Sequence, residues 1–235
     1  MARRRQLPNI YIPASSPEDW RQFLAEPEKH WRTGYSARAT AFAWQEANGF
    51  PQEIAALLSS SSDHNLSQVE LLLAIPEHKV YFPPLEGHPS QNDVFALGRA
   101  LNGDLLSIAV EAKVSEPFDL TVDEWIADPT RGKTERLDFL KDKLAIGSKP
   151  IGHIRYQLLH RLNSALQEAE RFSAKYAILV IHSFSQMDEW FGDFAAFVSL
   201  YGQVAVVGQL AALNIGSASK VFAGWARGDA KYLDA

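Results

Sequence analysis

The chain has 235 residues, of which 46% are hydrophobic and 22% charged, as expected for a globular protein with one sizeable domain. It contains no cysteine, which excludes disulfides, thiolate metal sites and a cysteine nucleophile. The formal net charge of −5 argues against a basic surface over the whole protein.

The start of the chain is basic, but no apolar segment follows it, so we expect no signal peptide. The longest apolar stretches, residues 176–181 and 204–213, are too short to span a bilayer. Together with the missing cysteines, these features predict a cytoplasmic protein without a membrane partner.

Helix signals come first along the chain. Ser16 and Pro17 form a typical helix start, with serine as the cap and proline in the first turn. Ser36 opens a second helix, which Gly49 is expected to end. These helices, and a short one after them, are expected from residue 17, over 37–48 and over 51–58.

Three apolar runs then predict strands. The first ends at Pro76, and residues 79–82 either extend it or form a short strand of their own. Asn102-Gly103 is a strong hairpin signal between the second and third runs. The three strands are expected over residues 69–75, 93–97 and 105–114.

Helices and strands alternate in the second half. The longest helical pattern carries an apolar stripe at the 3.6-residue period. Helices are expected over residues 121–127, 134–145, 152–172 and 187–200, and strands over 176–182 and 221–225.

This order predicts the α/β (α+β) class, with a mixed central sheet in a three-layer α/β/α sandwich. We expect a single domain over residues 1–235. Its parts would be a helical region (1–65), a core (66–185) and a C-terminal helix and strand (186–235).

Basic residues concentrate in residues 131–161, which carry eight Lys or Arg against three Asp or Glu, a local charge of +5. Such a stripe is what contact with a phosphate backbone requires. A pair of solvated helices would give the same pattern.

Two acids and a lysine stand out in the strand region. Asp93 heads the second strand, and Glu111 and Lys113 share one face of the third because side chains alternate along a strand. Carboxylates of this kind bind Mg²⁺, and a lysine beside them can orient or stabilise the reacting groups. Whether Asp93 meets Glu111 depends on the strand register, which stays open. The competing interpretation is a salt bridge on a half-exposed sheet.

An acid-x-Lys triplet alone is not specific, because it occurs three times in the chain. Glu77 follows Pro76 in an expected turn, and Asp229 lies near the C-terminus. Only Glu111 and Lys113 lie within an apolar strand.

With these residues, the segment from about 36 to 185 resembles the PD-(D/E)xK nuclease superfamily, with its restriction-endonuclease-like fold, and is similar to a bacterial branch of it. The resemblance implies a nuclease that hydrolyses phosphodiester bonds in DNA. Asp93 and Glu111 would bind Mg²⁺ or Mn²⁺, and Lys113 would assist the attacking water. The chain departs from the pattern in one respect, since Asn92 rather than proline precedes Asp93.

Accessory residues follow from the same resemblance. Glu46, or as second choice Glu53, would be a further metal ligand from an early helix, although either also suits a solvated helix surface. Gln157 would act in catalysis, with Arg161 standing where some relatives have tyrosine. Arg161 and Arg155 would bind the substrate phosphate. Gln157, Arg161 and Ser164 are expected on the helix face opposite the apolar stripe.

Two other interpretations stay open. One is a catalytically inactive nuclease-fold module that binds nucleic acid or a protein partner. The other is an unrelated α/β domain whose charged strand face is structural. DNA is the expected partner, and assembly into a homodimer is left open.

Overall fold

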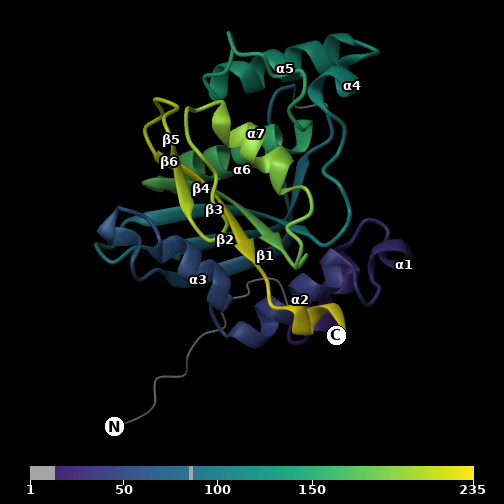
Figure 1. The fold of residues 1–235 in the computed structure, drawn as a ribbon, viewed down its shortest axis with the longest axis vertical. Helices are drawn as coiled ribbons and strands as arrows, with labels where there is room; N and C mark the ends of the chain where they lie inside the picture. Colours follow the sequence, from purple (N-terminus) through teal and green to yellow (C-terminus); the bar gives the residue numbers. More distant parts are fainter. Residues whose placement is uncertain (1–13, 85–86) are drawn as a thin grey trace.

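The computed structural model describes residues 14–84 and 87–235, which form a mixed six-stranded sheet in the order β1-β2-β3-β4-β6-β5. The first three strands make an antiparallel meander, β4 lies parallel to both β3 and β6, and β5 is antiparallel to β6 (Figure 1). The strands are β1 (Glu70–Val80), β2 (Ser90–Arg99), β3 (Leu105–Lys113), β4 (Tyr176–Ser183), β5 (Leu210–Leu213) and β6 (Lys220–Arg227).

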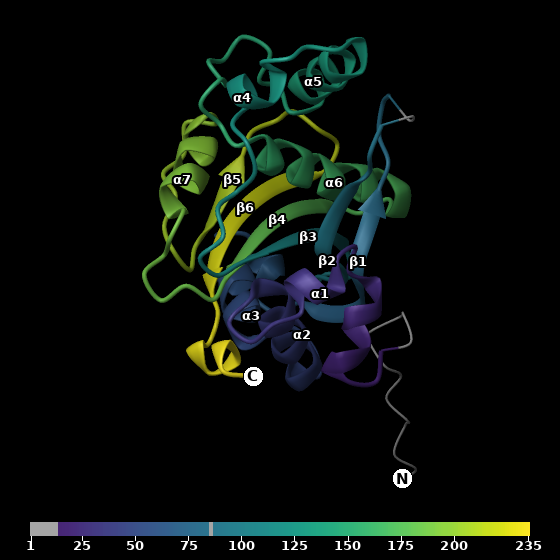
Figure 2. The same ribbon diagram turned by 90° about the vertical axis from the view of Figure 1, so that its right-hand side faces the viewer.

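Helices cover both faces of the sheet, as Figure 2 shows. α1, α2 and α3 lie on one face, together with the C-terminal turn, and α6 and α7 lie on the other, with α4 and α5 stacked beyond α6. The α-helices are α1 (Pro27–His30), α2 (Ser36–Ala47), α3 (Gln52–Ser59), α4 (Val122–Ile126), α5 (Arg131–Lys143), α6 (Tyr156–Phe172) and α7 (Phe191–Ser199). Short 3-10 turns occupy Pro17–Phe23, His64–Leu66 and Ala230–Leu233.

Each face of the sheet has its own apolar core. Ile108 and Val110 of β3 pack with Trp44 of α2 on one side, while Ala109 packs with Leu162 of α6 on the other. The expected alternation along β3 is therefore confirmed, and Glu111 follows Ala109 onto the α6 face. The predicted α/β class is also confirmed.

Strand β1 differs from its predicted end at Pro76. It continues to Val80 and includes residues 79–80 of the segment whose place was left open. Proline is tolerated there because β1 has a single neighbour in the described sheet, β2, and needs fewer ladder hydrogen bonds than a central strand. β5 was not predicted, since its four residues carry too short a pattern.

Some boundaries also shift. The first predicted helix is a 3-10 segment, and α2 ends with Asn48, not Gly49, in the left-handed conformation of the cap (φ 47°). α5 starts at Arg131, where the Thr130 hydroxyl caps it by accepting from the Lys133 amide. No helix in the described part of the chain is both long and apolar enough to cross a bilayer. The basic start, on which the signal-peptide expectation rests, lies outside the described residues.

Candidate active site

Asp93 and Glu111 meet at one end of the β2–β3 ladder. Paired residues extend as far as Val94 and Val110, so Asp93 and Glu111 are the next residue along each strand. Oδ2 of Asp93 accepts a hydrogen bond from the amide of Ala112 at 2.6 Å, which keeps the strands in contact there. The register left open by the sequence is thus one that brings both acids to the same place.

Three donors surround the Glu111 carboxylate, which is only 3% exposed. Nζ of Lys113 and Nε2 of Gln157 donate to Oε1 at 2.8 and 2.7 Å. Nε of Arg161 donates to Oε2 at 2.5 Å. We call Asp93, Glu111, Lys113, Gln157 and Arg161 the Glu111 cluster. All five were predicted as site residues, and the structure brings them together.

Electrostatics keep Glu111 ionised despite its burial. Burial on its own would raise the pKa of Glu111, but the charges of Arg161 and Lys113 outweigh that and hold the pKa below its usual value. For Lys113, burial would lower the pKa, but the attraction of Glu111 and Asp93 raises it above the usual value. The result is a buried ion pair reinforced by a second cation.

Asp93 is in the opposite situation. Burial, and then the negative charges of Glu111 and Glu77, raise the pKa of Asp93 well above its usual value. Its carboxyl group is therefore easier to protonate than that of Glu111 on the neighbouring strand. Two acids in one site thus have pKa values pushed in opposite directions.

A third carboxylate, that of Glu77, extends the row and was missed by the sequence analysis. It was expected in a turn after Pro76, but it lies inside β1, opposite Asp93. Its backbone is left-handed (φ 52°), which is unusual for a residue other than glycine, asparagine or aspartate. The pairs that flank this position are Pro76–Val94 and His78–Asn92.

The environment of Glu77 favours its protonated form. Nε2 of Gln91 donates to Oε2 of Glu77 at 2.6 Å. Burial nevertheless raises the pKa of Glu77 to about 7, with the neighbouring Glu111 charge acting in the same direction. The only sequence signal for this residue was the apolar run beyond Pro76, which allowed the strand to continue.

Arg161 connects the cluster to His160 through Ser90. Nη1 of Arg161 donates to Oγ of Ser90 at 2.9 Å, and Oγ lies 2.9 Å from Nδ1 of His160. Burial, followed by the charges of Arg161, Arg136 and Lys113, lowers the pKa of His160 well below its usual value, so the ring is neutral. Because Arg161 Nη1 also lies 3.2 Å from Nδ1 and arginine has only donors, Nδ1 must accept and the proton sits on Nε2.

A cleft of about 660 Å³ opens onto the cluster. Lys113 and Gln157 line it, and so does Arg155, whose Nε donates to Asp193 at 2.8 Å. Arg155 was predicted to bind substrate, and the structure places it in the same cleft as two cluster residues.

The predicted accessory ligands lie elsewhere. Glu46 is exposed on α2 and pairs with Lys231 at 2.8 Å, while Glu53 accepts from Nε2 of His182 at 2.6 Å. The structure brings neither acid to the Glu111 cluster. Their choice rested on helix position alone, and α2 and α3 cover the sheet face opposite the one from which Glu111 projects.

Two expectations about the basic segment need correction. Arg161 and Ser164 do not lie on an open helix face, because α6 runs between the sheet and the α4–α5 layer and both residues are buried. Four of the eight Lys and Arg side chains in residues 131–161 also pair with acids, so part of the expected basic stripe is neutralised internally. These pairs are Arg131 with Glu135, Lys143 with Glu170, Arg155 with Asp193 and Arg161 with Glu111. Lys133, Arg136 and Lys149 instead donate to uncharged oxygen atoms, those of the Asp128 carbonyl, the Tyr156 hydroxyl and the Leu200 carbonyl.

The carboxylates of Asp93 and Glu111 suit a hard divalent cation that takes few of its ligands from the protein. Among residues 14–84 and 87–235, no group of three or more His, Cys, Asp or Glu side chains is arranged to hold a metal ion. Mg²⁺ commonly takes only one or two carboxylates and keeps several waters, so Asp93 and Glu111 fit that pattern. Both oxygens of Glu111 now face cationic or amide donors, which a metal ion would have to displace.

The fold and the site define a mixed α/β protein with a buried Asp–Glu–Lys cluster at the end of a β-meander. The chain belongs to the family described as a domain of unknown function (DUF6946), whose model matches residues 13–230. Neither a curated protein nor a solved structure matches the chain.

Proposed function

We propose that this protein is a metal-dependent nuclease that hydrolyses phosphodiester bonds in DNA. The observation that carries the proposal is the register of β2 and β3, which brings Asp93 and Glu111 together with Lys113 at 2.8 Å from Glu111. Two carboxylates and an amine at one point are suited to phosphoryl transfer with a divalent ion. The earlier resemblance to nucleases supports the same reaction.

The metal would be Mg²⁺ or Mn²⁺, held by Asp93 and Glu111. When bound, such an ion lowers the pKa of water and neutralises phosphate charge. Lys113 stays protonated beside Glu111 and provides a positive charge for the developing negative charge on the phosphate. Gln157 fixes the orientation of Glu111 through its hydrogen bond to Oε1.

Substrate would enter through the cleft lined by Lys113, Gln157 and Arg155. Arg155 provides a cation at this cleft for a neighbouring phosphate. Arg161 balances the charge of Glu111 in the present arrangement. Its guanidinium would become available to phosphate when a metal ion balances that charge instead.

The direct test is cleavage of single- and double-stranded DNA with Mg²⁺ or Mn²⁺. We expect Lys113→Ala to reduce cleavage by about 100-fold or more, because it removes a charge positioned for the transition state. Glu46→Gln is the matched control, since Glu46 lies outside the cluster and should leave the rate unchanged. Equal cleavage by the wild type and Lys113→Ala would contradict the catalytic assignment.

One observation favours a second function, that of an inactive nuclease-fold module that binds nucleic acid or protein. Glu111 is already satisfied by Lys113, Gln157 and Arg161, so the cluster is electrostatically complete without a metal. Calorimetry distinguishes the two functions. DNA binding without any uptake of Mg²⁺ or Mn²⁺ would support the module, whereas metal uptake that Asp93→Asn abolishes would support the nuclease.

A further inference from the structure

A second cavity lies beside the Glu111 cluster, on the far side of α6. It has a volume of about 990 Å³, which is in the range of small-molecule sites. Its walls come from α4, α5 and the residues before α5, the first half of α6, and Pro84 with residues 87–89. We call it the Arg136 pocket, lined among others by Trp125, Arg131, Lys133, Arg136, Tyr156 and His160.

Arg136 is the unusual residue of this pocket. It is only 9% exposed, with its Nε donating to the Tyr156 hydroxyl at 2.9 Å and its guanidinium 3.9 Å from the centre of the Phe82 ring. Within the described ranges it has no carboxylate partner. A buried cation with no acid beside it among the described residues is costly, so an anion that enters the pocket gains a strong attraction.

The charges around Arg136 indicate an anion with more than one negative charge. Glu135 is the only acid that lines the pocket among the described residues, and it pairs with Arg131 at 2.6 Å. Lys133 donates to the backbone carbonyl of Asp128 and, like Arg136, forms no ion pair with a described acid. Two cations without acids match a phosphate monoester, which carries about −1.5 to −2 at pH 7, better than a single carboxylate.

The remaining walls favour a flat aromatic group attached to that phosphate. The rings of Trp125 and Tyr156 stack on one another, 3.9 Å apart between centroids and 9° from coplanar, and both line the pocket. Tyr156 is only 5% exposed, whereas Trp125 is half-buried, so Trp125 is the ring that offers a face to a ligand. Pro84 and Pro89 add apolar surface. Nucleobases stack on walls of this kind with little sequence preference.

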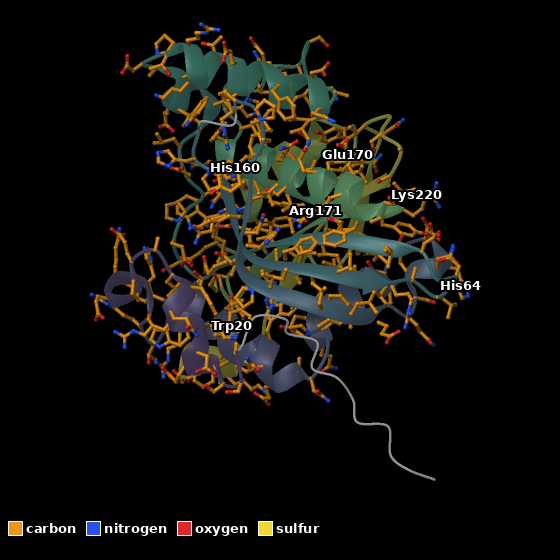
Figure 3. The ribbon with its side chains drawn as sticks, turned by 180° about the vertical axis from the view of Figure 1, so that it is seen from behind. Trp20, His64, His160, Glu170, Arg171 and Lys220 are labelled. Carbon is orange, nitrogen blue, oxygen red and sulfur yellow. The ribbon has the colours of Figure 1, made fainter. Side chains whose placement is uncertain are left out.

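His160 joins the pocket to the Glu111 cluster. It lies on α6 between the sheet and the α4–α5 layer, as labelled in Figure 3, and it lines the pocket. Its Nδ1 contacts Ser90, and Ser90 contacts Arg161, which binds Glu111. A ligand beside His160 is therefore one side chain away from the cluster, because His160 lies 3.2 Å from Arg161 and also contacts it through Ser90.

We propose that the Arg136 pocket binds a nucleotide through its phosphate monoester, either as a free nucleotide or as the phosphorylated end of a DNA strand. Arg136 binds the phosphate, Lys133 adds charge at the rim, and Trp125, backed by Tyr156, takes the base. This site is separate from the Glu111 cluster and does not depend on whether that cluster cuts DNA.

The test is equilibrium binding to the full chain in EDTA, which prevents any metal-dependent cleavage. The probes are dAMP, inorganic phosphate, and one oligonucleotide with either a 5′-phosphate or a 5′-hydroxyl. We expect dAMP or the 5′-phosphorylated strand to bind and to raise the thermal unfolding midpoint. Inorganic phosphate should bind at least tenfold more weakly, because it lacks the stacking group.

Variants assign the binding to the pocket. Arg136→Gln should weaken binding at least tenfold, and Arg136→Lys should weaken it less than Arg136→Gln does. The matched control is Arg99→Gln, at an exposed arginine that pairs with Glu70 away from the pocket, and it should change binding less than twofold. Circular dichroism verifies folding, and Arg136→Lys carries the test if the glutamine variant does not fold.

The outcomes separate the sources of the ligand. Binding of dAMP alone identifies a free nucleotide, and binding of the phosphorylated strand with rejection of its hydroxyl form identifies a strand end. The proposal is overturned if no probe binds the wild type, if folded Arg136→Gln binds as tightly as the wild type, or if phosphate binds as tightly as dAMP. A failed cleavage assay leaves all of these measurements unaffected.

Discussion

Arg161 and Arg136 are two arginines buried to nearly the same depth, with 7% and 9% exposure, but their surroundings differ. Arg161 donates to Glu111 at 2.5 Å and to Ser90 at 2.9 Å, so its charge is balanced inside the protein. Arg136 donates to the neutral Tyr156 hydroxyl and has no acid beside it among the described residues. Burial of a cation therefore does not reveal its role, whereas the presence or absence of an internal acid does.

His160 lies between these two environments. It contacts Ser90 and Arg161 on one side and lines the Arg136 pocket on the other. Burial, followed by the charges of both arginines, lowers the pKa of His160, so its ring stays neutral while it contacts both regions.

The largest expected effect comes from removing the acid that balances the cluster. Glu111→Gln leaves Lys113 and Arg161 buried without a full counter-charge, so we expect a loss of about 3–5 kcal/mol in the free energy of unfolding. Urea denaturation measures it. Asp93→Asn is the control and should cost less than about 1 kcal/mol, since an amide oxygen can still accept from Ala112. Similar losses in the two variants would show that Glu111 is not the balancing acid.

A matched pair of substitutions tests the two arginines directly. Arg161→Met removes one of the two cations of Glu111 and should cost about 3 kcal/mol of unfolding free energy. Arg136→Met removes an unbalanced cation along with its bond to Tyr156 and its contact with Phe82, and should cost about 1 kcal/mol or less. Thermal and urea unfolding of both variants, without ligand, give the comparison. A larger loss for Arg136→Met than for Arg161→Met would mean that Arg136 serves to stabilise the fold.

The pH dependence of stability tests the protonation of Glu77. Folded Glu77 loses its proton at a pKa of about 7, whereas in the unfolded chain it loses the proton near the ordinary glutamate value of 4.5. The folded state thus binds more protons between these values, and the free energy of unfolding falls as pH rises, by about 2 kcal/mol between pH 5 and 7.

Glu77→Gln lacks this titration, so its unfolding free energy should vary less over the same range. Urea denaturation of both proteins at half-unit pH intervals provides the measurement. Parallel curves for the two proteins would place the pKa of Glu77 near its ordinary value.

The smallest expected effect is at the connection between the two regions. Ser90→Ala removes the hydroxyl between Arg161 and His160, and we expect a loss of about 1 kcal/mol in unfolding free energy. Thermal unfolding measures this loss, and Ser59→Ala is a control at an exposed hydroxyl that bonds only to its own helix. A loss equal to that of the control would show that the hydroxyl does not hold Arg161 in place.

The sequence indicated much of this arrangement because the relevant patterns are local. Strand alternation placed Glu111 and Lys113 on one face, the Asn102-Gly103 turn joined β2 to β3, and the stripe on α6 located its buried side. These features depend on neighbours a few residues apart.

The parts that were missed depend on long-range packing. Glu77 was assigned to a turn because Pro76 normally ends a strand, although β1 continues past it. The partner of Arg161 is 50 residues away, and only the way α6 crosses the sheet makes it Glu111. Glu46 was chosen from its helix alone, without knowledge of which sheet face that helix covers.

The meander has a consequence for how the charges of the cluster are balanced. Short connections join β1, β2 and β3, so the three acids Glu77, Asp93 and Glu111 can assemble from neighbouring segments, whereas Arg161 arrives only when α6 docks. The acids that repel one another thus come from neighbouring segments, whereas the guanidinium that lowers the pKa of Glu111 comes from a distant one. The ionised state of Glu111 therefore depends on the docking of α6 against the meander.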